Sequence, residues 1–433
     1  MSSLRSFKRG GVAVPHRAPF SPGTMENAFL PLNAYVPLGD CDGPHEARPV
    51  VSEGGEVREG QLIARSSGKG SANVHSPIPG IVRRITRMRM PGGRERGIIV
   101  VSLEGSFSVL GKRPERYLWK SLNKTDIMHI VQEKGIVSVG QRMPLHDLLA
   151  AKSSPGGFPL VVNALEMDAW RRAEEEILRS RPLDVTDGCA IVARVAQSGP
   201  VILAVDPDFP QASIDSMLAS FKETGIEAVA ERFRRRFPQD MRHQLEEALA
   251  PVLKDGPRPL ILEPSTLVAL HDAVVSNKAH IEQYVYMGGG ALKRQDILKA
   301  RIGTPIGDLV EECGGFVGPP ERIIVNGPFR GHSAGSLDVP VTKTTRAVLA
   351  LTRHETMTAA TRHCVRCGQC VRSCPEGLSP HLLYKLLAAG RTAQARAEGL
   401  GSCTLCGACA YSCWSRLPLV ESFSGDRAEG NLG

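Results

Sequence analysis

The chain has 433 residues, 42% of them hydrophobic, and a formal net charge of +8, which suits two to four domains with buried cores. No apolar run approaches the roughly 18 residues of a membrane span, and residues 1–11 lack the apolar core of a secretory signal. We therefore expect a cytoplasmic chain with reduced thiols and no transmembrane helix of its own. Its basic residues are spread without an aromatic platform, so we expect no nucleic-acid partner.

Short apolar runs separated by glycine and proline recur through residues 31–86. One of them is Val74-His75-Ser76-Pro77, which leads to Gly80. Short strands with glycine turns at this spacing predict a β-sandwich or barrel.

Residues 120–260 alternate between apolar runs and helical patterns. The runs at 137–140, 160–163 and 201–206 predict buried strands, and helices are expected at 169–180, 214–224 and 242–252. This alternation predicts an open α/β sheet, which binds a nucleotide or flavin at the carboxyl ends of its strands or serves only as a scaffold.

The segment 261–345 predicts a compact α+β module, with a short helix at 308–313 that glycines then end. From residue 346 onward the pattern is helical. Ser379 suits an N-cap and Pro380 the first position of a helix that extends to about residue 389.

Two cysteine runs near the C-terminus share the spacing C-x2-C-x2-C-x3-C. In two-cluster ferredoxins with this spacing, the fourth cysteine of each run ligates the other cluster. Zinc sites prefer two separated C-x2-C pairs, so the spacing favours iron–sulfur clusters over a zinc scaffold. We therefore predict two [4Fe-4S] clusters: cluster A on Cys364, Cys367, Cys370 and Cys413, and cluster B on Cys403, Cys406, Cys409 and Cys374.

Further motifs occur from end to end of the chain. They are Phe7, Gly10, Gly11 and His16, then residues 74–80, 301–305, 326–328 and 339–343, then Cys364 to Pro375 with Leu378, Ser379 and Pro380. In these motifs the chain resembles the RnfC family, the peripheral subunits of the membrane-bound Rnf ferredoxin:NAD electron-transport complex. The C-terminal cysteine motif is the most specific part of the resemblance.

The resemblance implies a multidomain α+β chain with four units in order. They are a barrel-sandwich hybrid with an N-terminal extension (1–118), a flavin/NADH-type α/β domain (119–260), an SLBB β-grasp module (261–345) and an α-helical two-[4Fe-4S] ferredoxin-type domain (346–433). It also implies a peripheral place on the cytoplasmic face of the inner membrane, beside integral membrane and other peripheral subunits, with ferredoxin or NADH as redox partner.

The flavin and NADH sites that the resemblance implies are altered in this chain. The family's glycine-rich loop is reduced to Gly135 and Gly140, beside which Arg142 offers a charge suited to phosphate oxygens. Of the family's Glu-Cys-Glu-Pro-Tyr run, the acidic character persists in Glu166 and Asp168. A third loop carries Asp240 where the family has glycine. These departures predict weakened or lost binding of FMN and NAD(H).

The sequence leaves two versions of the function open. In the first, a flavin in the α/β domain takes two electrons from NADH and passes them singly to the clusters. In the second, the flavin site is vestigial and a soluble donor such as ferredoxin supplies the clusters directly. A soluble flavin/iron–sulfur protein of the cobalamin-reductase type, built from the same modules, is the alternative to both.

Overall fold

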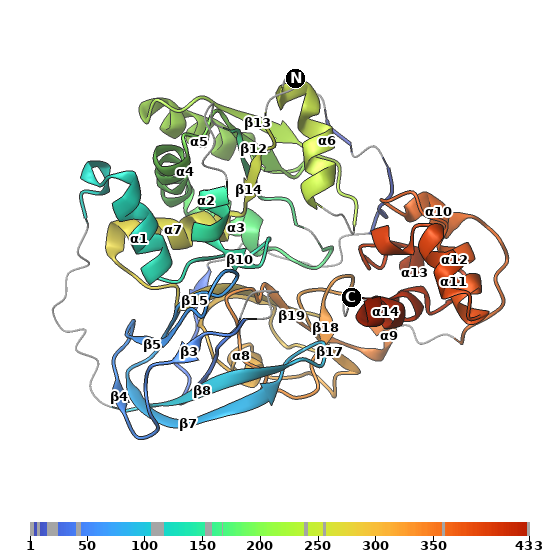
Figure 1. Ribbon diagram of the computed structural model, residues 1–433, viewed down its shortest axis with the longest axis horizontal. Helices are drawn as coiled ribbons and strands as arrows, with labels where there is room; N and C mark the ends of the chain where they lie inside the picture. The colour runs from blue at the N-terminus through green and yellow to red at the C-terminus, as the bar shows by residue number, and fades with distance from the viewer. Residues whose placement is uncertain are drawn as a thin grey trace.

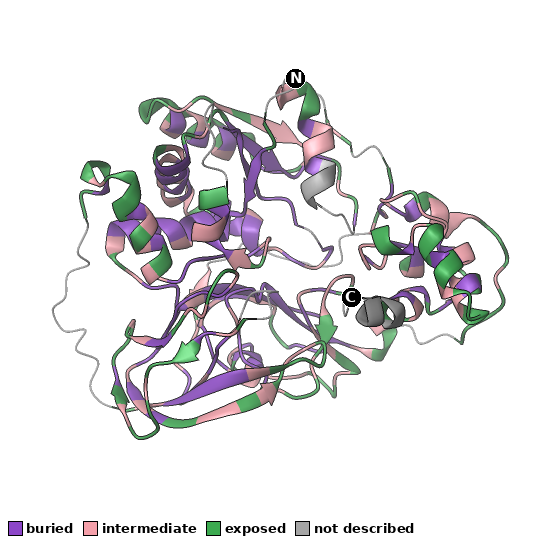
Figure 2. Ribbon diagram, in the orientation of Figure 1, coloured by how far each residue is buried: buried purple, intermediate pink, exposed green. Residues whose placement is uncertain are grey.

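The computed structural model describes residues 4–6, 9–14, 25–39, 45–104, 117–151, 158–166, 168–237, 241–253, 257–356 and 360–430. Figure 1 shows a helical C-terminal unit at one side of three units that contain the sheets. Figure 2 shows burial concentrated in the strands of those sheets. The multidomain α+β expectation is confirmed. Phe7, His16 and Asp240 lie outside the described residues.

Two small antiparallel sheets form the N-terminal unit, with strand orders β2-β8-β7-β4 and β3-β5-β6. Their shared core includes Val36, Ile63 and Ile99, all fully buried. A Cβ at Gly80 would lie 1.8 Å from the Ser102 carbonyl oxygen, so glycine lets the two long strands approach each other. The strands are β2 (Asn33–Pro37), β3 (Arg48–Pro49), β4 (Glu56–Val57), β5 (Leu62–Arg65), β6 (Val74–His75), β7 (Gly80–Arg89) and β8 (Glu95–Leu103).

Four parallel strands in the order β13-β12-β11-β14 form the sheet of the α/β unit. Leu160 and Val162 of β11 pack into the core that includes α4 and α7, whereas Val161 packs against α6 on the other face. The strands are β11 (Leu160–Asn163), β12 (Val201–Val205), β13 (Ala228–Arg232) and β14 (Leu260–Leu262). The helices are η1 (Trp119–Ser121), α1 (Lys124–Glu133), α2 (Leu145–Ala151), α3 (Ala173–Ser180), α4 (Pro182–Ala196), α5 (Gln211–Glu223), α6 (Met241–Leu253) and α7 (Pro264–Ser276).

Two details of this unit differ from what we expected. Residues 137–140 do not join the parallel sheet, because β9 (Val137–Ser138) pairs with β10 (Met143–Pro144) in a separate hairpin. The sheet also continues past the boundary expected at residue 260, since β14 pairs with β11 and α7 packs on α4. A boundary drawn from local pattern cannot see a pairing with a strand a hundred residues earlier.

A six-stranded sheet of order β1-β16-β15-β19-β17-β18 forms the third unit. Its edge strand β1 comes from the N-terminal segment, and its central strand β19 follows the boundary expected at residue 345. The elements are β1 (Glu26–Asn27), β15 (Glu282–Gly288), β16 (Asp296–Arg301), α8 (Ile306–Glu312), β17 (Arg322–Val325), β18 (His332–Ser333) and β19 (Ala347–Leu351).

Short helices make up the C-terminal unit, and the N-terminal segment ties it to the rest. Gly11 N–H donates to Ser373 O (3.0 Å). Gly10 has φ +71°, and a Cβ there would lie 2.5 Å from Pro375 Cα, so only glycine fits this contact. The helices are α9 (Arg353–Thr356), α10 (Gln369–Ser373), α11 (Pro380–Ala388), α12 (Thr392–Ala397), η2 (Leu400–Ser402), α13 (Ala408–Tyr411) and α14 (Leu419–Gly430). Among the described helices, none has the length and apolar character that crossing a bilayer requires.

One buried lysine joins the three sheet-containing units. Lys343 Nζ donates to Asn73 O (2.8 Å) in the N-terminal unit and to Gly135 O (2.9 Å) in the α/β unit. Burial, and then the charge of Lys343, lowers the pKa of both His75 and His280 to about 3. Both imidazoles are therefore neutral at neutral pH and add no second positive charge to the junction.

Candidate metal centre

The C-terminal unit contains two cysteine-lined cavities. The first lies beside the loop that leads into α10. It measures about 460 Å³, counting the space open to solvent. Arg366 (φ 53°) and Gly368 (φ 74°) have left-handed backbone, which curls the loop around the cavity. The cavity is lined by three thiols of the first run and one of the second: Cys364, Cys367, Cys370 and Cys413.

The second cavity, of about 370 Å³ counted in the same way, repeats this construction with the runs exchanged. Leu405 (φ 52°) and Gly407 (φ 83°) occupy the same places around the second cysteine as Arg366 and Gly368 do in the first run. The thiols that line this cavity are Cys403, Cys406, Cys409 and Cys374.

The thiols stand around the walls of each cavity and do not converge on one point. In the described part of the chain, no three Cys, His, Asp or Glu side chains lie close enough to hold a single metal ion. Burial, followed by the charge of neighbouring cysteines, raises the pKa of Cys409; the neighbours that act on it are Cys406, Cys403 and Cys374. Crowded thiolates of this kind need positive charge among them, and a coordinated metal deprotonates a thiol outright.

Hydrogen-bond donors surround the sulfur atoms. Backbone N–H groups of His381 and Val371 donate to Cys370, and that of Leu417 donates to Cys413 Sγ (3.5 Å). Each cavity also has one buried polar side-chain atom without a partner among the described residues: His381 Nδ1 in the first and Thr404 Oγ1 in the second. Four thiols, N–H donors to sulfur and unpaired polar atoms fit an iron–sulfur cluster in each cavity.

The two cavities differ in exposure. Cys367 is exposed, and Val365 and Trp414, which line the first cavity beside it, are 67% and 76% exposed. Three of the four cysteines of the second cavity are buried. Its Pro375 wall packs against Gly10 of the N-terminal segment. The first cavity therefore opens to solvent, and the second lies toward the body of the protein.

The structure does not gather the five residues expected at a flavin or NADH site. Gly135 lies at the Lys343 junction, where a Cβ would come within 2.1 Å of Asn73 O. Arg142 is exposed at the turn of the β9–β10 hairpin, and its N–H donates to Ser138 O (2.8 Å). Gly140 lies beside the carboxyl end of β14, where its N–H donates to Glu263 (3.0 Å).

The two acidic residues expected at the flavin site, Glu166 and Asp168, lie in different places. Glu166 accepts from Glu174 N–H (3.0 Å), and burial together with the charge of Glu174 raises its pKa to about 8. Asp168 accepts from the N–H groups of Phe329 (3.0 Å) and Arg330 (3.4 Å), and burial raises its pKa to about 6. Asp168 therefore holds a loop of the third unit, whose Phe329 packs edge-on against Tyr411 of the C-terminal unit.

Sequence reasoning missed Glu174 and Glu263, the two carboxylates nearest Gly140 and Glu166. Glu263 directly follows an apolar run at the end of β14. That position at the carboxyl end of a strand is the signal from which it was predictable.

Sequence profiles of three families match this chain. They are the RnfC barrel sandwich hybrid domain over residues 6–106, the SLBB domain over 284–331 and the 4Fe-4S dicluster domain over 356–414. The barrel-sandwich, SLBB and dicluster expectations are thereby confirmed. A crystal structure of an NAD⁺-reducing [NiFe]-hydrogenase in the air-oxidized state is similar over 73% of this chain and 67% of that one, with a TM-score of 0.49 and 13% identity.

Curated relatives match over nearly the whole chain. The C subunit of the proton-translocating ferredoxin:NAD(+) oxidoreductase complex of Clostridium ljungdahlii is 28% identical over 388 residues, 88% of this chain and 84% of that protein. The C subunit of the ion-translocating oxidoreductase complex of Rhodobacter capsulatus is 31% identical over 431 residues, 97% of this chain and 82% of that protein. From its fold, its cysteine-lined cavities and these relatives, the chain belongs to the RnfC family, the C subunits of ion-translocating oxidoreductase complexes.

Proposed function

We propose that this chain is the electron-transfer subunit of an ion-translocating ferredoxin:NAD oxidoreductase complex. One observation carries the proposal: each cavity combines three thiols of one cysteine run with the fourth thiol of the other. We assign one [4Fe-4S] cluster to each set of four, cluster A to the first cavity and cluster B to the second. A bound cluster of this type takes up and releases one electron at a time.

The chain's own residues prepare both places. The thiols bind, the backbone N–H groups aimed at sulfur stabilise the thiolate form, and apolar side chains such as Leu417, Leu383 and Phe423 exclude water. Because both sets draw on both runs, each is complete only when the two runs pack together. In this proposal the two clusters lie side by side within one small domain.

The same proposal includes the chain's surroundings. It lies at the cytoplasmic face of the inner membrane as a peripheral subunit, in contact with integral membrane and peripheral subunits of an Rnf-type complex. The names of the relatives support membership of such a complex, as both are subunits of translocating complexes.

Metal analysis of anaerobically purified protein tests the proposal. We expect about eight irons and eight acid-labile sulfides per chain, with a dithionite-reduced electron paramagnetic resonance spectrum of two interacting [4Fe-4S]⁺ centres. About one zinc per thiol set, without labile sulfide, would instead mark a zinc scaffold.

Charge reversal at Arg366 tests where a soluble partner docks. Arg366 lines the first cavity, which opens to solvent beside the exposed Val365 and Trp414. Residues 360–420 contain seven Lys or Arg against two Asp or Glu. We propose that this face receives an acidic electron carrier. We expect Arg366→Glu to slow reduction by an acidic ferredoxin about tenfold at low ionic strength, and less as salt is raised.

The matched control is Arg396→Glu, the same charge change on the exposed face of α12, outside both cavities. Stopped-flow absorbance of cluster reduction gives both rates. Equal slowing in the two variants would mean that only net charge matters and would contradict docking at the first cavity.

A further inference from the structure

The place where a sheet of this topology binds its ligand is filled in this chain by protein. From β11 the chain proceeds outward to β12 and β13, then returns to β14 on the other side of β11. Ligands of open α/β sheets bind outside the carboxyl ends of the strands at such a reversal. Here the residues at that point are Glu166, after β11, and Glu263, Ser265 and Thr266, after β14. We call this place the switch-point crevice.

The first set of backbone donors in the crevice is already occupied. Gly140 N–H donates to Glu263 Oε2 (3.0 Å), and Val139 N–H donates to Thr266 Oγ1 (3.1 Å). A Cβ at Gly140 would lie 1.6 Å from Glu263 Oε1. Glycine here thus admits a carboxylate of the protein, in the role that a cofactor phosphate plays where a glycine loop meets a ligand.

A second carboxylate occupies the first turn of helix α7. Ser265 donates to Glu174 through its backbone N–H (2.9 Å) and its Oγ (2.7 Å). The N-terminus of a helix after a parallel strand is the usual place for a phosphate in these folds. Both groups of donors that a phosphate requires are therefore bound to carboxylates that are themselves almost fully buried, Glu174 at 2% and Glu263 at 3% exposure.

The charges of the crevice are balanced without a ligand. Arg346 lies 3.8 Å from Glu263, and Arg171, whose pKa burial lowers only to about 10, stays positive at neutral pH. The pKa of about 8 keeps Glu166 mostly protonated at neutral pH. A phosphate dianion entering the crevice would meet Glu174 and Glu263 at contact distance, and the cations described beside them, Arg346 and Arg171, already balance these carboxylates.

We infer that the α/β domain of this chain is closed by its own carboxylates, holds no FMN, and leaves the chain able to exchange electrons only with one-electron carriers. Oxidation of NADH delivers two electrons as a hydride, which a flavin accepts and a single [4Fe-4S] cluster does not. The donor and the acceptor of this chain must then both be carriers such as iron–sulfur or flavodoxin-type proteins. This second statement rests on the proposed cluster function, while the closure of the crevice does not.

Flavin and iron counted in one sample test the closure. The full chain is purified anaerobically and dialysed against FMN at about 0.1 mM, where a site of ordinary cofactor affinity would be saturated. We expect no acid-released flavin above the dialysate, while iron stays at about eight per chain. About one FMN per chain would overturn the closure and leave the cluster proposal standing, whereas low iron would count against the clusters alone.

Reduction by two donors tests the electron pathway. NADH added to the same oxidised protein should leave its visible absorbance unchanged, and a dithionite-reduced ferredoxin should bleach it. Bleaching by NADH at a rate similar to that by ferredoxin would overturn the inference. As a variant control, Glu263→Gln keeps the acceptor for Gly140 N–H but removes a charge. We expect this variant to remain free of flavin, because the side chain at position 263 still fills the crevice after its charge is removed.

Discussion

A Cys374→Ala/Cys406→Ala double variant is expected to keep about four irons per chain, whereas Cys374→Ala/Cys367→Ala is expected to lose nearly all of them. The reason is the grouping of thiols. Cys374 and Cys406 line the same cavity, while Cys367 lines the other. Cys374 and Cys406 line the second cavity together although 32 positions separate them in the sequence.

Iron and labile sulfide analysis of the two double variants, with the three single variants as controls, decides the wiring. Each single variant should retain about four irons, because each removes one ligand of one cluster. The reverse pattern for the double variants would mean that each cysteine run holds its own cluster. Far-ultraviolet circular dichroism distinguishes cluster loss from general unfolding, because a chain that loses only its clusters keeps most of its signal from the three sheet-containing units.

The cluster ligands were the part of the site most open to prediction from sequence. Three thiols at C-x2-C-x2-C spacing are brought around one cavity by a single loop, so their proximity is local. The positive φ of Gly368 and Gly407 shows how the same local turn is built twice. The helix expected from Ser379 and Pro380 is likewise confirmed as α11, with Ser379 at the N-cap position and Pro380 first in the helix, although the Ser379 side chain makes no capping hydrogen bond.

The closed crevice was not predictable in the same way. Gly140 and Glu263 are 123 positions apart, and Ser265 and Glu174 are 91 apart. The sequence shows that glycines of the family's loop are missing, but it does not show that Glu263 and Glu174 take the place of a ligand. The place of Glu263 after an apolar strand marks it as a candidate site residue, but an acidic residue at the start of a helix is common for dipole reasons alone, so nothing local indicates that Glu263 accepts from Gly140. The Lys343 junction between three units was not predictable for the same reason, since its partners lie 208 and 270 positions away in the sequence.

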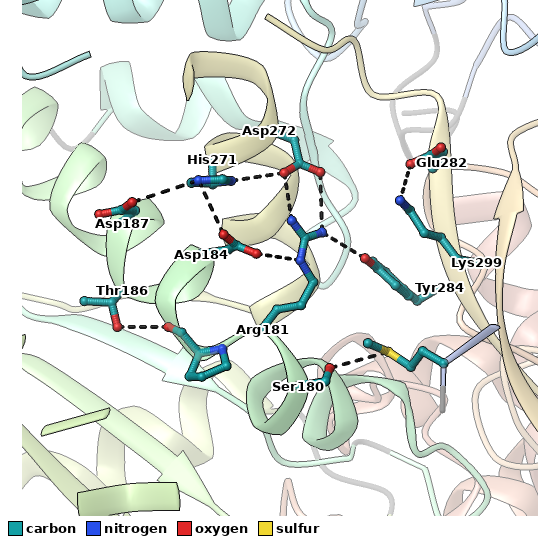
Figure 3. Close-up of polar contacts among 12 residues, drawn as sticks. Ser180, Arg181, Asp184, Thr186, Asp187, His271, Asp272, Glu282, Tyr284 and Lys299 are labelled. Atoms are coloured by element: carbon teal, nitrogen blue, oxygen red, sulfur yellow. Dashed lines mark hydrogen bonds and ion pairs between the residues drawn. The ribbon is translucent and has the colours of Figure 1, made fainter. Parts of the chain in front are cut away.

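Replacing Arg181 with leucine is expected to cost about 2–3 kcal/mol of unfolding free energy, below the 3–5 kcal/mol of a fully buried pair. Arg181 is the centre of the contacts in Figure 3, with hydrogen bonds to Asp184 (2.6 Å), Asp272 (2.9 Å) and Tyr284 (2.9 Å). Its side chain is 23% exposed and that of Asp272 is 19% exposed, so leucine would leave a largely buried carboxylate without its cation. Tyr284 belongs to β15, and the loss would therefore loosen the joint between the α/β and SLBB units.

Urea unfolding followed by tryptophan fluorescence measures this cost, since Trp119 is buried in the core of the α/β unit. The control is Arg65→Leu, which breaks a 3.8 Å pair with Glu133 whose side chains are 60% and 38% exposed. Exposed pairs of this kind contribute about 0–1 kcal/mol, so this variant should unfold almost as the native chain does. A similar loss in both variants would mean that the leucine, not the missing ion pair, is responsible.

The pH dependence separates the ion pair from lost packing. Burial acts to raise the pKa of Asp272, but hydrogen bonds and charges of His271 and Arg181 hold it below its usual 3.8. A carboxylate with a depressed pKa stabilises the fold above its unfolded value and loses that contribution as the pH falls below it. Without Arg181 the pKa of Asp272 rises. As the pH falls, Asp272 of the variant is therefore protonated at a higher pH than in the native chain, which removes the cost of its buried charge. The difference between native chain and variant should therefore shrink as the pH falls from about 7 toward 3.8 and below, whereas a difference caused by packing would stay constant.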